Sequence, residues 1–213
     1  MEDGGYVVAQ LRTNGHRVVE AHLNGDSVKA LTGSMVAYEG KVQFKKASFG
    51  AGEGVMKTLK RKATGESLDL MECVGQGVVY LAQMGSYIEL IALAGDKLSV
   101  ESSALLAYES TLSTNVTFAG MHGMSAGQGL TTTSVSGHGA VAILSDGPAI
   151  CLEVSPQYPV TVDPQAYLGS SGQLQQGFVT GVNWKSLIGE GSGEPFSLQF
   201  SGTGRVWIQP AER

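Results

Sequence analysis

Short apolar runs separated by polar breaks recur along the whole chain. His22, for example, alternates with the apolar neighbours Ala21 and Leu23, and a period of two is that of a β-strand with one buried face. The breaks are rich in Gly, Asn, Asp and Ser, which are the residues of tight turns. No run approaches the ~18 uninterrupted apolar residues of a membrane-spanning helix. The pattern predicts an all-β fold of many short strands.

Three stretches have matching frames of apolar and polar positions. They are RVVEAHLNGDSV at 17–28, YIELIALAGDKL at 87–98 and AICLEVSPQYPV at 149–160. We interpret each as a hairpin with a polar turn in its middle. The three predicted turns are Asn24-Gly25-Asp26, Gly95-Asp96 and Ser155-Pro156-Gln157.

A polar corner and a second apolar run follow each predicted hairpin. The tripeptide Ala-Tyr-Glu occurs in this run at 37–39 and again at 107–109. The third stretch departs there, with Gly169 and Ser170 at the Ala and Tyr places. A recurrence over distances of this size indicates a modular chain.

A glycine motif closes each of the three stretches. It reads CVGQGVVYLA at 73–82, VSGHGAVAIL at 135–144 and FSGTGRVWIQ at 200–209. A dinucleotide fingerprint needs a helix after its glycines to hold the pyrophosphate. Here the flanks are apolar strand patterns, so we predict hairpin turns and no phosphate cradle.

The frames divide the chain into three pseudo-equivalent β modules at about 16–84, 86–147 and 149–210. We expect residues 1–213 to form a single compact unit in which the modules share a core. The segment YVVAQL at Tyr6–Leu11 is predicted to lie next to the terminal strand Val206–Gln209. In that strand Trp207 alternates with Val206 and Ile208, so it is predicted to be packed in the core or at an interface.

The repeated motifs also carry a family resemblance. The segments KATGESLDLMECVGQGVVYLA, VTVDPQAYLG and GSGEPFSLQFSGTGRVWIQP are similar to the altered-inheritance-of-mitochondria (mitochondrial biogenesis) family, and the likeness covers essentially the whole chain. It implies a barrel-like, double-stranded β-helix fold like that of the tryptophan RNA-binding attenuation protein, triplicated in one chain. It also implies homo-oligomers. The family offers no catalytic residue to carry over.

Composition agrees with a folded, non-secreted protein. Hydrophobic residues make up 42% of the chain and charged residues 15%, with 30 glycines, which excludes a disordered chain. Cys73 and Cys151 lie in apolar patterns without metal spacing, so we expect two buried free thiols and a cytoplasmic location. The acidic start MEDGGYVVAQL is not that of a signal peptide.

Residues with catalytic or metal-binding chemistry are few. His16, His22, His122 and His138 show no metal-binding spacing, so no metal and no cofactor are expected. Residues 123–127 match G-x-S-x-G around Ser125, but a nucleophile elbow needs a strand before the serine and a helix after it. The flanks are loop-like and β-rich, so a hydrolase is not favoured and we predict no enzyme.

Charge is concentrated in one segment. Residues 41–62 carry a net charge of +6, although the whole chain carries −5. This segment contains seven of the fourteen basic residues and a single acid, Glu53; the seven are Lys41, Lys45, Lys46, Lys57, Lys60, Arg61 and Lys62. Residues 55–62 have the pattern of two helical turns. The segment predicts one cationic face on an acidic molecule.

Several roles for the basic segment stay open. One interpretation is a solvated loop, or a loop that pairs with acidic residues of a neighbouring subunit. A second is a binding surface for a protein partner, and a third is a binding surface for RNA or an anionic membrane. Only Phe44 and Phe49 offer aromatic contacts to bases, and no RNA-binding motif is present. The favoured function is a non-enzymatic oligomeric scaffold or interaction protein, and the alternative is an anion-binding module.

Overall fold

The computed structural model describes residues 10–47, 68–119, 130–179 and 197–211. Within these ranges the chain is almost entirely β-strand, with one short 3-10 helix, η1 (Ser102–Ala104). The strands are β1 (Gln10–Asn14), β2 (Val18–Leu31), β3 (Met35–Lys46), β4 (Leu70–Leu81), β5 (Tyr87–Glu101), β6 (Leu105–Glu109), β7 (Ser113–Ala119), β8 (Leu130–Ser145), β9 (Ile150–Val154), β10 (Val160–Val162), β11 (Tyr167–Val179) and β12 (Ser197–Ile208). The predicted all-β fold is confirmed.

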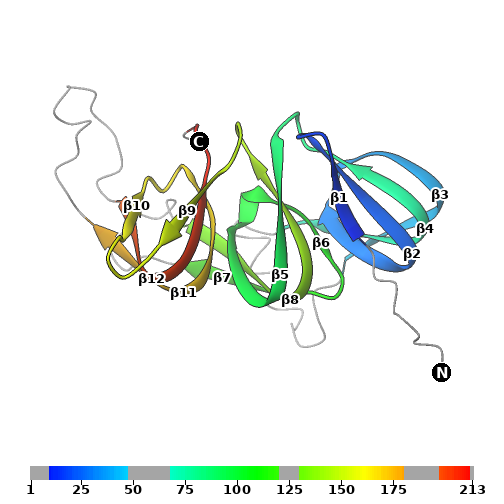
Figure 1. Cartoon of the computed structure of the whole chain (residues 1–213). Helices are drawn as coiled ribbons and strands as arrows, with labels where there is room; N and C mark the ends of the chain where they lie inside the picture. The colour runs from blue at the N-terminus through cyan, green and yellow to red at the C-terminus, as the bar shows by residue number, and fades with distance from the viewer. Residues whose placement is uncertain (1–9, 48–67, 120–129, 180–196, 212–213) are drawn as a thin grey trace.

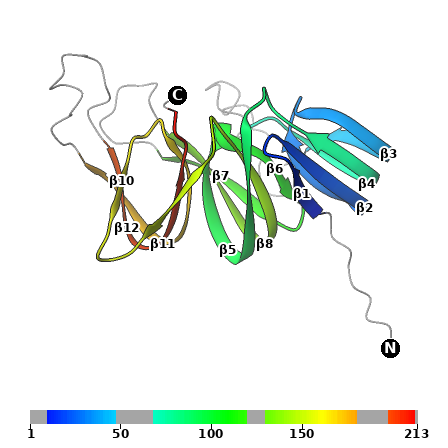
Figure 2. The same cartoon turned by 45° about the horizontal axis from the view of Figure 1, so that its top comes forward.

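The strands form one antiparallel sheet of twelve, in the order β10-β12-β11-β5-β8-β6-β2-β4-β3. β1 pairs with β2, β7 with β8 and β9 with β12 off this path. The sheet is open and does not close into a barrel as the family resemblance implied. Its sharply bent strands form three sections in a row, β1–β4, β5–β8 and β9–β12, so that β3 and β10 lie at opposite ends of the molecule (Figures 1 and 2).

Residues 17–28 do not form the predicted hairpin, because β2 runs through them as one strand. It pairs with β4 from Val19 to Leu31, and the register shifts only between Asn24 and Ser27. Gly25 takes φ +89° and the backbone N–H of Asn24 donates to Asp26 Oδ1 at 3.0 Å. These features form a β-bulge, which bends a strand without reversing it.

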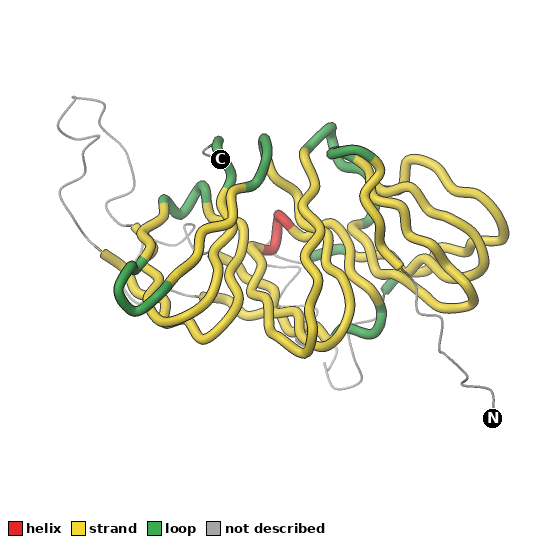
Figure 3. The backbone as a smooth tube through the Cα atoms, viewed as in Figure 1, coloured by secondary structure: helices red, strands yellow, loops and turns green. Residues whose placement is uncertain are grey.

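The second predicted hairpin is wrong for the same reason. β5 pairs with β8 on both sides of a register shift between Ala94 and Lys97. In the third section a tight turn closed by the Ser155–Tyr158 bridge forms at the predicted place. The flanking strands β9 and β10 nevertheless both pair with β12 and follow one another along it. Figure 3 shows how far the long strands run without a loop.

The glycine motifs are not turns either. Gly75 and Gly77 lie inside β4, Gly137 and Gly139 inside β8, and Gly202 and Gly204 inside β12. All except Gly204 have positive φ. A Cβ on Gly77 would overlap the carbonyl oxygen of Glu39 on β3, and one on Gly204 would overlap that of Ser171 on β11. These glycines let two backbones approach closely where the strands bend.

The N-terminal strand does not lie where the sequence predicted. Of the segment Tyr6–Leu11, which was predicted to lie beside Val206–Gln209, the structure describes Gln10 and Leu11. These two residues belong to β1 and pair with His22 and Ala21 of β2. The first true reversal of the chain follows, at residues 15–17. β1 thus adds a strand to the first section and leaves the edge of β12 to β9 and β10.

Three clusters of buried apolar residues make up the core, and two of them cross the section boundaries. The first cluster lies in the first section but includes Leu106 and Ala142 of the second. The second cluster includes Leu168 and Trp207 of the third section, so the predicted packing of Trp207, which is 6% exposed, is confirmed. The third cluster, around Val162, Leu198 and Phe200, contains third-section residues only.

Candidate functional site: the exposed edge of β3

β3 is the last strand of the sheet and pairs with β4 alone among the described strands. Ten of its twelve residues are exposed and none is buried. Val36 is 59% exposed and Tyr38 50%, and the Tyr38 ring meets that of Phe44 edge-on at 5.4 Å. A long edge strand with apolar side chains presents unpaired N–H and C=O groups to any chain that can add to it.

Three of the seven predicted basic residues lie on this strand. Lys41, Lys45 and Lys46 are all exposed, and Lys45 lies opposite Glu72 of β4. The structure therefore brings these lysines together with Tyr38 and Phe44 on one edge. The other four basic residues of the prediction, and the predicted helical turns at 55–62, lie outside the described residues: Lys57, Lys60, Arg61 and Lys62.

The tripeptide Ala-Tyr-Glu has two different environments. In β6, Ala107–Glu109 pairs with Val28–Ala30 of β2, and Tyr108 is fully buried. In β3, Ala37–Glu39 pairs with β4 only, and all three residues are exposed. The same three residues are thus covered where strands pair with them on both sides and open where the described structure places only β4 beside them.

Glu109 shows what this position does when it is covered. Its carboxylate accepts backbone N–H groups from Leu11 of β1 and from Ala140 of β8, both at 3.0 Å. The side chain is 8% exposed, so these bonds replace water as its partners. Glu39, by contrast, accepts a bond of 2.6 Å from the Tyr80 hydroxyl at the surface, and this bond, first among the causes, raises the pKa of Tyr80.

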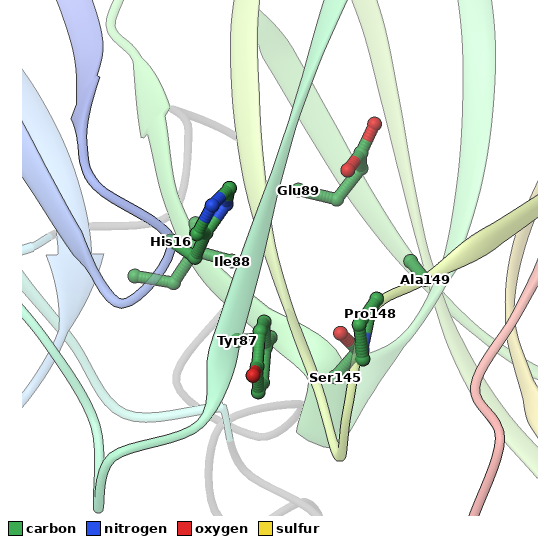
Figure 4. Close-up of a pocket in the computed structure, with 7 residues that line it drawn as sticks. All are labelled: His16, Tyr87, Ile88, Glu89, Ser145, Pro148 and Ala149. Carbon is green, nitrogen blue, oxygen red and sulfur yellow. The ribbon is translucent and has the colours of Figure 1, made fainter.

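A cleft of about 310 Å³ lies beside the start of β5, between the β1–β2 turn and the β8–β9 connection. His16 comes from the β1–β2 turn, and Pro148 and Ala149 come from the β8–β9 connection on the other side of β5 (Figure 4). Glu89 contributes a carboxylate to the lining of the cleft. The guanidinium of Arg17 lies over the ring of Tyr87, 4.5 Å from the ring centroid. The Ser145 hydroxyl donates to the Gly147 carbonyl at 2.6 Å, and this hydrogen bond stabilises the turn after β8.

The remaining reactive side chains are dispersed. Cys73 is buried, as predicted, and burial, with the nearby charge of Glu72, raises the pKa of its thiol to about 11. Cys151 is exposed, so the prediction of a second buried thiol is wrong; β9 lies at an edge of β12 where one of its faces meets solvent. Partial burial is the largest of the causes that raise the pKa of Cys151.

The described histidines do not form a metal site. His22 contacts the Glu20 carboxylate at 2.9 Å, and the hydrogen bond from Asn14, followed by that to His22, lowers the pKa of Glu20. His138 lies inside β8 and not in a turn. The described part of the chain contains no group of three potential metal ligands, while His122 and Ser125 lie outside it.

The described sheet is open and all-β, and its exposed edge at β3 carries aromatic and basic side chains. The chain belongs to the family described as mitochondrial biogenesis AIM24, whose model matches residues 9–211. The family resemblance stated from the motifs is confirmed.

The fold is also similar to that of a known structure. A crystal structure of a Streptococcus pyogenes protein from a structural genomics consortium is 22% identical, with a TM-score of 0.71 over 96% of this chain and 93% of that one. No individually curated protein matches the chain. Among the described helices, none has the length and apolar character to cross a bilayer.

Proposed function

We propose that this protein is a non-enzymatic scaffold that works as a homo-oligomer and presents its surface to a protein partner. The observation that carries the proposal is the twelve-residue edge of β3, which has no second partner among the described strands. On this edge Val36 is 59% exposed and Tyr38 is 50% exposed. Natural proteins commonly shorten, charge or cover such an edge. A partner strand that pairs with β3 would satisfy its backbone groups and bury its apolar side chains.

The proposal treats the three sections as copies of one module in a single compact unit. Strand registers support this treatment. The central residues of the segments 37–39, 107–109 and 169–171 are Tyr38, Tyr108 and Ser170, and they lie opposite Val79, Val141 and Val206, respectively. A one-residue register shift precedes each of these pairs, at residues 36, 106 and 168. The double-stranded β-helix arrangement implied by the family resemblance remains a prediction.

A cytoplasmic location completes the proposal. Cys73 and Cys151 form no disulfide, and unpaired thiols are typical of reducing compartments. Fractionation of cells that express the full chain, followed by thiol labelling in the intact cell, tests it. A protein found only in an oxidising compartment would contradict it.

Light scattering coupled to size exclusion tests the assembly. The scaffold predicts one discrete oligomer whose mass is the same at low and high salt, because apolar burial and backbone pairing are little screened. A matched pair of variants locates the contact: Tyr38→Asp on the β3 edge should lower the mass, and Met84→Asp should not. A monomer at all protein concentrations would refute the scaffold.

Anion binding is the second candidate function, and the cluster of Lys41, Lys45 and Lys46 on the exposed β3 favours it. A cationic strand attracts RNA or an anionic bilayer, and contact of about five charges with a nucleic acid gives a log–log salt slope of about −4. The test is titration with a single-stranded RNA and with phosphatidylserine vesicles. Replacing the three lysines with glutamate should abolish binding, whereas Lys97→Glu on β5 should leave it intact.

A further inference from the structure

Consecutive sections of the sheet are joined by one kind of junction, which occurs twice. Between the first and second sections, Val28, Lys29 and Ala30 pair with Glu109, Tyr108 and Ala107. Between the second and third sections, Leu98, Ser99 and Val100 pair with Ser171, Ser170 and Gly169. Both junctions are antiparallel, three residues long and in the same register. In each, the segment after a bulge in β2 or β5 pairs with the three residues that follow the register shift in β6 or β11.

Two segments equivalent to the halves of this junction lie at the two ends of the described sheet, and each is paired on one side only. Val160–Val162 of β10 holds the place of 28–30 and 98–100, because all three segments follow a bulge or the tight turn and pair with the glycine-motif strand. Ala37–Glu39 of β3 holds the place of 107–109 and 169–171. Neither has a second partner among the described strands. They lie at opposite ends of the row (Figures 1 and 2).

The core shows the same difference between the two internal junctions and the two ends of the sheet. At the first junction Leu106, the bulge residue before the pairing tripeptide, enters the first section's cluster and is fully buried. At the second junction Leu168 enters the second section's cluster and is also fully buried. The third cluster receives no such residue from a following section. The corresponding residue of the first section, Val36, is 59% exposed.

We propose that copies of this chain join head to tail through a third junction of this kind. Ala37, Tyr38 and Glu39 of one copy pair with Val162, Thr161 and Val160 of the next, and Val36 enters the cluster around Val162 and Phe200. The inference rests on the proposed homo-oligomer and names its contact surfaces. The contact is heterologous, since the two copies contribute different surfaces.

The side chains at the two open edges fit this register. The segments 28–30, 98–100 and 160–162 each end opposite a small residue. This residue is Ala107 at the first junction, Gly169 at the second and Ala37 in the proposed contact. A Cβ on Gly169 would lie 2.9 Å from the Ser99 carbonyl, which shows how close the strands come there. An apolar residue faces Glu109 and Ser171, and Val160 would likewise face Glu39. The Lys29 ammonium lies 5.9 Å from the centre of the Tyr108 ring, so a side chain covers that ring, as Thr161 would cover Tyr38.

Cross-linking of chains with one accessible cysteine, Cys73 being buried, tests the register. In a Cys151→Ser background, Tyr38→Cys and Thr161→Cys are made in separate chains and mixed with a short bifunctional thiol reagent. Residues directly opposite in a sheet have Cβ atoms about 5 Å apart, so the mixture should give a heterodimer that neither chain gives alone. Gln43→Cys replaces Tyr38→Cys in the control mixture, which should not cross-link.

The bulge residue provides an independent test. Val36→Asp should raise the dissociation constant of self-association by about tenfold or more, because it places a charge in an apolar contact. The thermal unfolding of the isolated chain should be unchanged, since Val36 is exposed there. Met84→Asp, at an apolar residue that is 95% exposed, is the matched control and should assemble normally.

The failures of the two proposals are distinguishable. An oligomer in which Tyr38→Cys chains cross-link with each other shows symmetric edge pairing and overturns the head-to-tail contact, but leaves the scaffold standing. An oligomer that Val36→Asp does not weaken also overturns the contact. A wild-type chain that stays monomeric refutes both.

Discussion

At the scale of single residues, the glycines do the most to shape this sheet. Gly75, Gly77, Gly137, Gly139 and Gly202 all hold a positive φ in the middle of long strands. L-residues with a side chain avoid this conformation, and a neighbouring backbone occupies the space a Cβ needs at several of these positions. The glycines are therefore required both by conformation and by the close approach of strands.

The two requirements separate in a pair of alanine variants. Gly75→Ala combines φ +139° with overlap between the new Cβ and the Lys41 carbonyl oxygen, and should lower the free energy of unfolding by about 3 kcal/mol. Gly25→Ala has φ +89° with no atom within 4 Å and should cost about 1 kcal/mol. Urea unfolding of both variants measures this. Equal losses would show that the close approach costs nothing.

Thiol chemistry should separate the two cysteines. The thiolate is the reactive form, and a raised pKa lowers its fraction at pH 8. Cys151 is exposed and should react with a thiol reagent more slowly than free cysteine, with a rate that rises about tenfold per pH unit below its pKa. Cys73, buried with its pKa at about 11, should react only in denaturant. Two thiols titrated in the native protein would contradict this.

At the scale of elements, the sequence predicted strand content better than strand connection. Asn24-Gly25-Asp26 correctly marks positive φ, but a hairpin and a bulge both need it. Which one forms is decided by the distant strand β4, which pairs with β2 on both sides of the break. The lysines of the candidate edge were visible as a charge cluster. Val36 was not, because its exposure follows from the absence of a neighbouring section among the described strands and not from its local pattern.

Glu109 ties three elements together, and its replacement should loosen them. Glu109→Gln substitutes an amide for one of the two carboxylate oxygens that accept from Leu11 and Ala140. One buried N–H then faces a donor, which should cost about 2 kcal/mol. Hydrogen exchange should show the loss first in β1, which the carboxylate anchors to β6. The matched control Glu153→Gln, on the exposed face of β9, should change neither stability nor exchange.

At the scale of the whole molecule, the core makes the three sections depend on one another. The second cluster contains residues from near the end of β3 to β12, Ala47 and Trp207 among them. The clusters of the first two sections are thus completed by residues of the next section, and we expect the chain to unfold as a unit although its outline is a row of three.

Leu168→Ala tests this dependence. It removes a fully buried side chain of the third section from the cluster of the second, and should cost about 3 kcal/mol. Far-UV and near-UV circular dichroism should still report one common transition, shifted to lower urea. Two separated transitions would show that the sections unfold independently. Ile150→Ala, at a residue 46% exposed, should shift the midpoint far less.

The identical register of the two internal junctions also bears on how such a chain evolves. The middle section carries both halves of the junction, 107–109 facing the first section and 98–100 facing the third. Duplicating or deleting one section in the gene would therefore join surfaces that already match, with no new contact to be selected. Lineages are then free to differ in the number of sections per polypeptide, and a three-section chain is one point in that series.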